Sequence, residues 1–294
     1  MKQYNNTKIL VCCHKDDIKA TEEPYLPIHV GKELSNCDLN IATDNTGNNI
    51  SIKNNSYCEL TGVYWAWKNL IDTEIVGLCH YRRYFDFHQQ CQPIKPYTIF
   101  HTSYFSNLNL SIPPQIIKSV KEGLIILPRR ESFAISAMDQ YNAGHYNSDL
   151  SIVNNIIKEL YGIKYSRAMW KSLVNNNKIS LANMFIMNWE NFNAYCNWLF
   201  PVLFRAEEVI NFENYPPYQK RVFGFIAERL LNVWVYAENK KVKRFPIILL
   251  ANQNDKMSQT PVWKYSMGYL LNEVIHLCQK IEYKFALMPN LNKL

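Results

Sequence analysis

The sequence predicts an α/β fold in which a mixed, mostly parallel sheet is flanked by helices within a single domain, residues 1–294. Apolar runs of strand length recur along the chain and alternate with polar loops and amphipathic helices, which is the order of an α/β protein. Hydrophobic residues make up 48% of the 294 residues, which is enough to form a large core and argues against a disordered chain. No repeat, low-complexity tract or linker divides the chain, so we expect one domain.

Short apolar runs bounded by polar residues predict the strands. The predicted strands are 8–13, 38–43, 75–79, 123–128, 180–187 and 244–250. Apolar residues at helical spacing predict the helices, which begin after Ser56 and at 148, 188, 221 and 264. Ser56 and Glu59 have the spacing of a capping box, and Pro201 predicts that the helix from 188 kinks or ends there. Residues 86–112 predict an irregular surface excursion.

The charge and the cysteines limit the classes of partner. A net charge of +7 suits an anionic small substrate, a membrane surface or nucleic acid, without choosing among them. The eight cysteines form no CxxC pair, which argues against a zinc or thioredoxin-like motif and for free thiols in a reducing compartment. Neither a signal-peptide pattern nor an apolar run of membrane-spanning length occurs, so we expect a cytoplasmic protein.

The strand 75–79 ends in the cluster His80-Tyr81-Arg82-Arg83. Arginine forks match phosphate oxygens, and ligands of α/β sheets commonly bind at the carboxyl ends of strands. A surface salt-bridge cluster is the alternative interpretation. Strand 8–13 likewise ends in a polar turn, whose His14 and Lys15 are candidate nucleotide-binding residues.

Further polar residues have both a functional and a structural interpretation. The loop with Asp44, Lys53 and Asn54 offers groups for a nucleotide sugar, or is a solvated turn. Glu59 either completes the capping box or acts in catalysis. Glu228 in FGFIAERLL is either paired with a neighbouring arginine or held for proton transfer.

His145 and Asp149 are a second candidate pair, four residues apart at a predicted helix start. They could serve an acceptor hydroxyl as a base, whereas helix capping by Asp149 is the simpler explanation.

Several motifs are absent from the sequence. No GxxxxGK[ST], GxGxxG, GxSxG or HExxH occurs, and no Asp-x-Asp follows an apolar strand. Asp-x-Asp is the usual metal-binding motif of nucleotide-sugar transferases. Because it is absent here, we expect no divalent metal and no cofactor.

The segments PIHVGKEL, DNTGNNISIKNNSYCELTGVYWAWKNL, VGLCHYRRYF, ANMFIM and GFIAERLLNVW together resemble a bacterial family of capsular and exopolysaccharide glycosyltransferases. This family, long described as a domain of unknown function, includes polymer-building galactofuranosyltransferases. The resemblance implies a GT-A-like, Rossmann-like fold and inverting transfer of a sugar, galactofuranose in the best-attested case, from UDP to a glycan or lipid-linked oligosaccharide. Asn45 and Asn48 stand where the family usually shows acids.

The resemblance also suggests roles. Arg82, Arg83 and His80 would face the diphosphate, and Glu228 would be the base, with Asp149 as the alternative. In related folds the strand ANMFIM borders the sugar and acceptor pocket, so Asn183 and Met184 are expected there. Another UDP-hexose, or a non-catalytic sugar-nucleotide-binding scaffold, remains an alternative.

The sequence also bears on two other classes of partner. A nucleic-acid-binding protein would need a continuous basic face, but the clearest basic run, 240–244, is far from the arginine cluster, and no RNA motif accompanies it. The helical region of about 255–294 is amphipathic. Core packing is its default interpretation, and contact with an anionic membrane surface or with other polysaccharide-assembly enzymes is the alternative.

Overall fold

The computed structural model describes residues 4, 6–92, 94–252 and 261–287, with side chains as far as residue 281. Of the predicted C-terminal region, residues 255–260 and 288–294 lie outside the described residues. Within the described part of the chain, no helix is long and apolar enough to cross a membrane.

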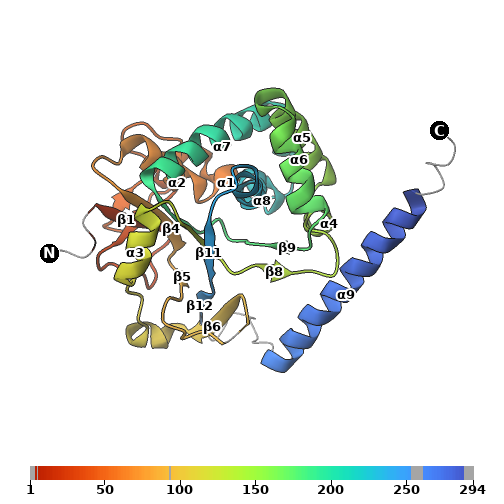
Figure 1. The fold of residues 1–294 in the computed structure, drawn as a ribbon. Coiled ribbons are helices and arrows are strands. Elements are labelled where there is room, and N and C mark those ends of the chain that lie inside the picture. Colours follow the sequence, from red (N-terminus) through yellow and green to blue (C-terminus); the bar gives the residue numbers. More distant parts are fainter. Residues whose placement is uncertain (1–3, 5, 93, 253–260, 288–294) are drawn as a thin grey trace.

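The main sheet has β4 near its centre, with β1 beside it on one side (Figure 1). β1 is parallel to β4, and β10 pairs antiparallel with β4 on the other side. The strand order of the sheet is β11-β7-β10-β4-β1-β2-β3, and β5, β12 and β6 extend it from β4. The strands are β1 (Thr7–Cys13), β2 (Tyr25–His29), β3 (Ala42–Thr43), β4 (Ile75–His80), β5 (Arg83–Phe85), β6 (Tyr97–His101), β7 (Ile125–Pro128), β10 (Phe185–Asn188), β11 (Val242–Phe245) and β12 (Ile247–Ala251). Two short strands, β8 (Glu131–Ser132) and β9 (Lys178–Ile179), pair separately.

Helices cover both faces of the sheet because the central strands are apolar on both sides. In β1, Leu10 and Cys12 enter the larger core with α2, α5, α7 and α8, whereas Ile9 and Val11 enter the smaller core with α3. The helices are α1 (Asn54–Tyr57), α2 (Leu60–Asn69), α3 (Pro114–Lys121), α4 (Ala137–Gly144), α5 (Asn147–Tyr161), α6 (Ile163–Met169), α7 (Trp189–Val209), α8 (Val222–Ala237) and α9 (Val262–Leu287). The predicted fold class, a mixed, mostly parallel sheet flanked by helices, is confirmed.

Several predicted element boundaries are wrong. The predicted strand 38–43 is reduced to the two residues of β3, while β2, which contains Pro27, pairs with β1 and was not predicted. The helix from 188 does not end at Pro201 but continues to Val209. The predicted excursion 86–112 contains β6, which pairs with β12.

The capping box is also wrong. Cys58 has a φ of 53°, which separates α1 from α2, so Ser56 lies inside α1 and Glu59 precedes α2 without a side-chain cap. The Glu59 side chain is therefore available to the cavity described next.

Candidate active site

A cavity of about 1080 Å³ opens at the carboxyl ends of the parallel strands β1 and β4. This is the edge of an α/β sheet where ligands commonly bind. Its walls come from the ends of β1 and β4, the α1–α2 junction, the start of α8, and β12. The lining residues are Cys12, His14, Val30, Asn54, Asn55, Cys58, Glu59, His80, Tyr81, Arg82, Arg83, Pro217, Lys220, Arg221, Gly224, Phe225, Glu228, Leu249 and Leu250.

The β4–β5 turn supplies one cationic wall. His80 at the end of β4 pairs with Arg83 at the start of β5, so Tyr81 and Arg82 form the turn between them. Arg82 Nη2 lies 2.9 Å from Asp17 Oδ2, which anchors this guanidinium to the loop after β1. Arg83 is exposed in the cavity, and within the described residues no carboxylate lies at ion-pair distance from it.

The approach to α8 supplies a second cationic wall with Lys220 and Arg221. Arg221 Nε donates a hydrogen bond to Cys58 Sγ at 3.2 Å, and its guanidinium lies 5.5 Å from the centre of the Phe225 ring. Neither cation is predicted as a site residue from the sequence. Their only signal is a basic pair directly before a strong amphipathic helix.

A two-residue turn, Ala182–Asn183, holds three titratable side chains of the site. Both residues have positive φ, 76° and 51°. The Ala182 N–H donates to Glu228 Oε1 at 3.0 Å, and the Ala182 carbonyl lies 2.9 Å from His80 Nε2. Because a carbonyl only accepts, His80 Nε2 carries a proton, which leaves Nδ1 as the acceptor in the neutral ring. Backbone strain of this kind is concentrated at functional sites.

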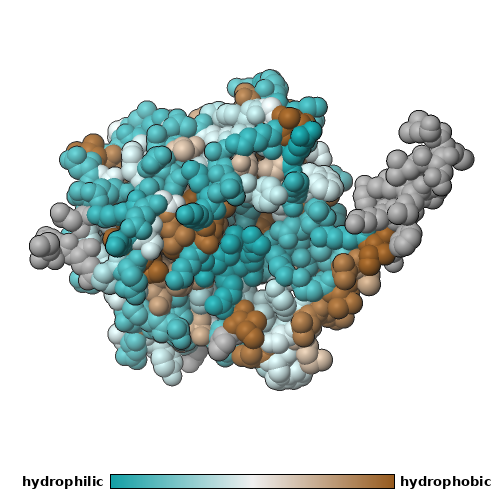
Figure 2. All heavy atoms as spheres, viewed as in Figure 1, coloured by the Kyte–Doolittle hydropathy of each residue, from teal (hydrophilic) through white to brown (hydrophobic). Residues whose placement is uncertain are grey.

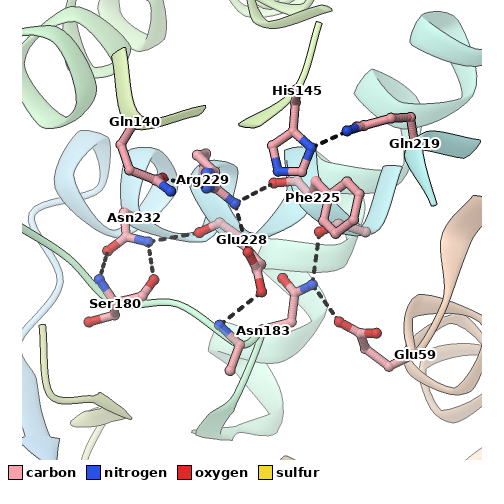
Figure 3. Close-up of polar contacts among 12 residues, drawn as sticks. Glu59, Gln140, His145, Ser180, Asn183, Gln219, Phe225, Glu228, Arg229 and Asn232 are labelled. Carbon is pink, nitrogen blue, oxygen red and sulfur yellow. Dashed lines mark hydrogen bonds and ion pairs between the residues drawn. The ribbon is translucent and has the colours of Figure 1, made fainter. Parts of the chain in front are cut away.

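Asn183 completes this arrangement from beneath the cavity. Its Nδ2 donates to Glu59 Oε1 at 2.6 Å and to the Gly224 carbonyl at 3.0 Å (Figure 3). Glu59 and Glu228 are thereby held by the same turn, one through an amide side chain and the other through a backbone N–H. The predicted strand 180–187 is wrong at its start, since β10 begins only at Phe185.

The environment changes the proton affinity of Glu228 and His80. Burial raises the pKa of Glu228, with Arg229 opposing the shift and Glu59 adding to it. Arg229 Nη1 pairs with Glu228 Oε2 at 2.7 Å. Burial lowers the pKa of His80; the negative charge of Glu59 opposes this shift, and Arg83 reinforces it. A carboxylate with raised proton affinity is a better base near neutral pH than an ordinary one.

The structure brings most of the predicted nucleotide-binding residues into this one cavity. His14 packs edge-to-face on Tyr81, with ring centres 5.3 Å apart. The predicted residues that line the cavity are His14, Asn54, Glu59, His80, Tyr81, Arg82, Arg83 and Glu228.

Three predicted residues of the N-terminal part lie outside the lining. Asp44 is fully buried and accepts hydrogen bonds from the backbone N–H groups of Gly31 and Lys32, so it shapes a turn. The Lys53 ammonium pairs with Glu207 at 2.7 Å. Lys15 is exposed beside Asp17.

Four predicted residues of the C-terminal part also lie outside the lining: Asn183, which contacts the site through Glu59, and Asp149, His145 and Met184. Asp149 is buried and accepts from the hydroxyls of Tyr215 and Tyr141, so it neither caps α5 through its side chain nor faces the cavity. His145 stacks on Phe225 behind the cavity wall, with ring centres 4.2 Å apart. Met184 is fully buried in the smaller core, which corrects the expectation that it lines the pocket.

The described residues contain no group of three or more histidine, cysteine or acidic side chains placed to hold a metal ion. The charged atoms that face the cavity are mainly cations, with the carboxylate of Glu59 at the α1–α2 junction and that of Glu228 on α8. This arrangement suits an anionic ligand that the cations bind and whose reacting atom lies next to one of the two carboxylates.

Comparison with known proteins places the chain in a family. It belongs to the family described as "Domain of unknown function (DUF4422)", whose model matches residues 8–240. All charged residues of the cavity lie in that range. The fold is similar to that of a solved structure titled "WbbM bifunctional glycosytransferase apo structure", with 31% sequence identity and a TM-score of 0.75. The match covers 88% of this chain and 48% of that one, so this chain spans about half of its length. No curated protein matches.

Proposed function

We propose that this chain is a glycosyltransferase that transfers a sugar, galactofuranose, from a UDP donor to a glycan or lipid-linked oligosaccharide. The pathway would be synthesis of capsule, exopolysaccharide or O-antigen. The observation that carries the proposal is the cavity itself, in which Arg83, Lys220 and Arg221 face the same space as Glu59 and Glu228. The similarity in fold to a bifunctional glycosyltransferase supports the same reaction class.

In the proposed mechanism the cations hold the donor diphosphate. As the bond between the anomeric carbon and the diphosphate breaks, negative charge grows on the leaving oxygen. Preorganised donors aimed at that charge lower the barrier, and removing one such donor typically costs roughly 10²- to 10³-fold in rate. Arg83 is the first candidate for this role because it has no carboxylate partner at ion-pair distance in the described chain. Arg82, tied to Asp17, would fix the geometry of the turn.

Glu228 is the proposed base. It would take the proton from the acceptor hydroxyl as that oxygen attacks the anomeric carbon from the face opposite UDP, which inverts the configuration. Its raised pKa and its fixed carboxylate, held by Ala182 and Arg229, both suit proton abstraction. Glu59 is the alternative base, since it lines the same cavity and its Oε1 is oriented by Asn183.

We propose that the transfer needs no divalent metal, because the guanidinium and ammonium groups supply the positive charge that a metal provides in other nucleotide-sugar transferases. We also propose a cytoplasmic location, where nucleotide sugars are available. The furanose form of the sugar rests on the family resemblance; another UDP-hexose would fit the same chemistry.

The decisive experiment is a panel of UDP-sugars, including the furanose form, tested for donor hydrolysis and for transfer. We expect UDP to raise the melting temperature and one donor to be turned over. Arg83→Gln should lose UDP stabilisation, and Glu228→Gln should bind UDP but lose turnover. Binding without turnover of any donor would support the non-catalytic scaffold instead. Stabilisation by oligonucleotides and not by UDP would refute the proposal.

A further inference from the structure

The C-terminal helix α9 is oriented with its polar side toward the body of the protein. Asn272 Nδ2 donates to the Ser132 carbonyl at 2.8 Å, and Glu273 pairs with Lys178 at 2.7 Å. The Lys178 ammonium also lies 4.7 Å from the centre of the Tyr269 ring. These polar and aromatic contacts hold the helix against β8 and β9. They leave the apolar side of an amphipathic helix in water, the reverse of the usual arrangement.

Leu271 aside, which is also exposed and adjoins the row, the exposed large apolar residues described in α9 follow a regular spacing. They recur at alternating steps of four and three, and each is between 45% and 66% exposed. These seam residues are Trp263, Met267, Leu270, Val274, Leu277 and Ile281. Figure 2 shows apolar side chains in a row along α9, which extends away from the rest of the molecule (Figure 1). A repeat of 3.5 residues matches the seam of a coiled coil, in which a second helix covers the row.

The residue types along the seam indicate what kind of partner helix would cover it. With Trp263, Leu270 and Leu277 at d positions, the a positions are Met267, Val274 and Ile281. Branched Val or Ile at a with Leu at d favours parallel, two-stranded coiled coils. A parallel pair in register places each seam residue against its own copy, which a two-fold dimer provides automatically.

The flanking positions agree with this pairing. In register, Ser266 faces the partner's Leu271 and Glu273 faces the partner's Cys278, so these flanking pairs bring no like charges together. A lipid surface is less consistent with the helix, since interfacial helices carry cations along a wide polar face. Here Glu273 stands between Lys264 and Lys280, so the polar positions carry both signs of charge.

We propose that two copies of this chain associate through α9 as a parallel, two-stranded coiled coil. The helix lies outside residues 8–240, which match the family model, and its seam faces away from β8 and β9. The proposal is independent of the enzymatic one, because no seam residue lines the cavity.

The first test is sedimentation equilibrium of the full chain between about 1 and 100 μM, a range over which a dimer with a dissociation constant of that order dissociates measurably. The double variant Leu270→Lys with Leu277→Lys should raise the dimer dissociation constant at least about 100-fold, as expected when two core leucines are lost and charge is buried. Ile71→Lys is the matched control: this exposed apolar residue lies between α2 and β4, and its replacement should leave the constant unchanged. Unchanged circular dichroism of each variant shows that the fold is kept.

The second test determines the orientation of the helices. In a Cys37→Ser, Cys278→Ser background, Leu270→Cys should form an intermolecular disulfide on mild oxidation, because d positions face each other in a parallel dimer. Gln279→Cys, off the seam, should not. A monomer at all concentrations, a dimer that survives the lysine pair, or failure of Leu270→Cys to cross-link would overturn the proposal. So would a monomer that sediments with anionic vesicles through α9, since lipid would then be the occupant.

Discussion

Replacing Asn183 tests whether the Ala182–Asn183 turn holds the site together. The Asn183 side chain is 4% exposed, and its Nδ2 donates both to the Glu59 carboxylate and to a backbone carbonyl. A buried hydrogen bond to a charged group contributes about 1.5–3 kcal/mol and a neutral one about 0.5–1.5 kcal/mol. The positive φ of 51° costs alanine about 1 kcal/mol more than asparagine or glycine. Asn183→Ala should therefore lower the free energy of unfolding by about 3–5 kcal/mol.

Two further variants separate the parts of this effect. Asn183→Gly removes both hydrogen bonds but tolerates the backbone, so it should be about 1 kcal/mol less damaging than alanine. Asn40 also has a φ of 51°, and its side chain is exposed, so Asn40→Ala should cost only the backbone part, about 1 kcal/mol.

Urea denaturation followed by circular dichroism gives all three values by linear extrapolation. If Asn183→Ala and Asn40→Ala destabilise equally, the two hydrogen bonds contribute nothing and the reasoning is refuted. In the proposed enzyme, both Asn183 variants should also reduce turnover, because Glu59 loses its orienting donor.

Four other outcomes follow, three from the same site and one from the packing of β4. Burial raises the pKa of Glu228 and a base must be ionised, so activity should fall with decreasing pH through a midpoint above the ordinary pKa range of glutamate. Glu228→Gln should lower activity roughly 10²- to 10⁴-fold and abolish this acidic limb of the pH profile. Arg83→Gln should lower kcat roughly 10²- to 10³-fold, whereas Arg205→Gln, on an exposed helix face, should not, and equal losses would contradict the leaving-group role. Activity should survive EDTA, and strict dependence on Mn²⁺ or Mg²⁺ would contradict the proposal that cationic side chains replace a metal. Gly77→Ala should destabilise the fold by about 1–3 kcal/mol in urea melts, because a Cβ there would lie 2.5 Å from Ile9 Cδ1; a neutral result would show that the strand packing relaxes freely.

The β4 strand and the cluster after it could be predicted from the sequence because both depend on local pattern. An apolar run ending in His-Tyr-Arg-Arg predicts a buried strand with cations at its end, and β4 ends at His80. Lys220 and Arg221 could not be found in this way. They reach the same cavity from about 140 residues further along the chain, and only the packing of α8 beside α1 brings them there.

Glu59 shows how a correct local rule can mislead. The spacing from Ser56 to Glu59 is that of a capping box, but the left-handed backbone at Cys58 breaks the helix between them. The predicted capping by Asp149 is wrong for a related reason, because two tyrosine hydroxyls from outside its helix donate hydrogen bonds to the carboxylate. In both cases tertiary contacts overrode a helix-end preference that is worth only about 1 kcal/mol.

The electrostatics of the cavity connect the two halves of the proposed reaction. Burial raises the pKa of Glu228; Arg229 lowers it, Glu59 raises it further, and Arg83 lowers it by a smaller contribution. A donor diphosphate placed against Arg83 would neutralise that cation, and the pKa of Glu228 would then rise further. His80 would respond in the same direction, because Arg83 also lowers its pKa. Binding of the donor would therefore strengthen the base before the acceptor arrives, and departure of UDP would weaken it again, which favours release of the proton taken from the acceptor.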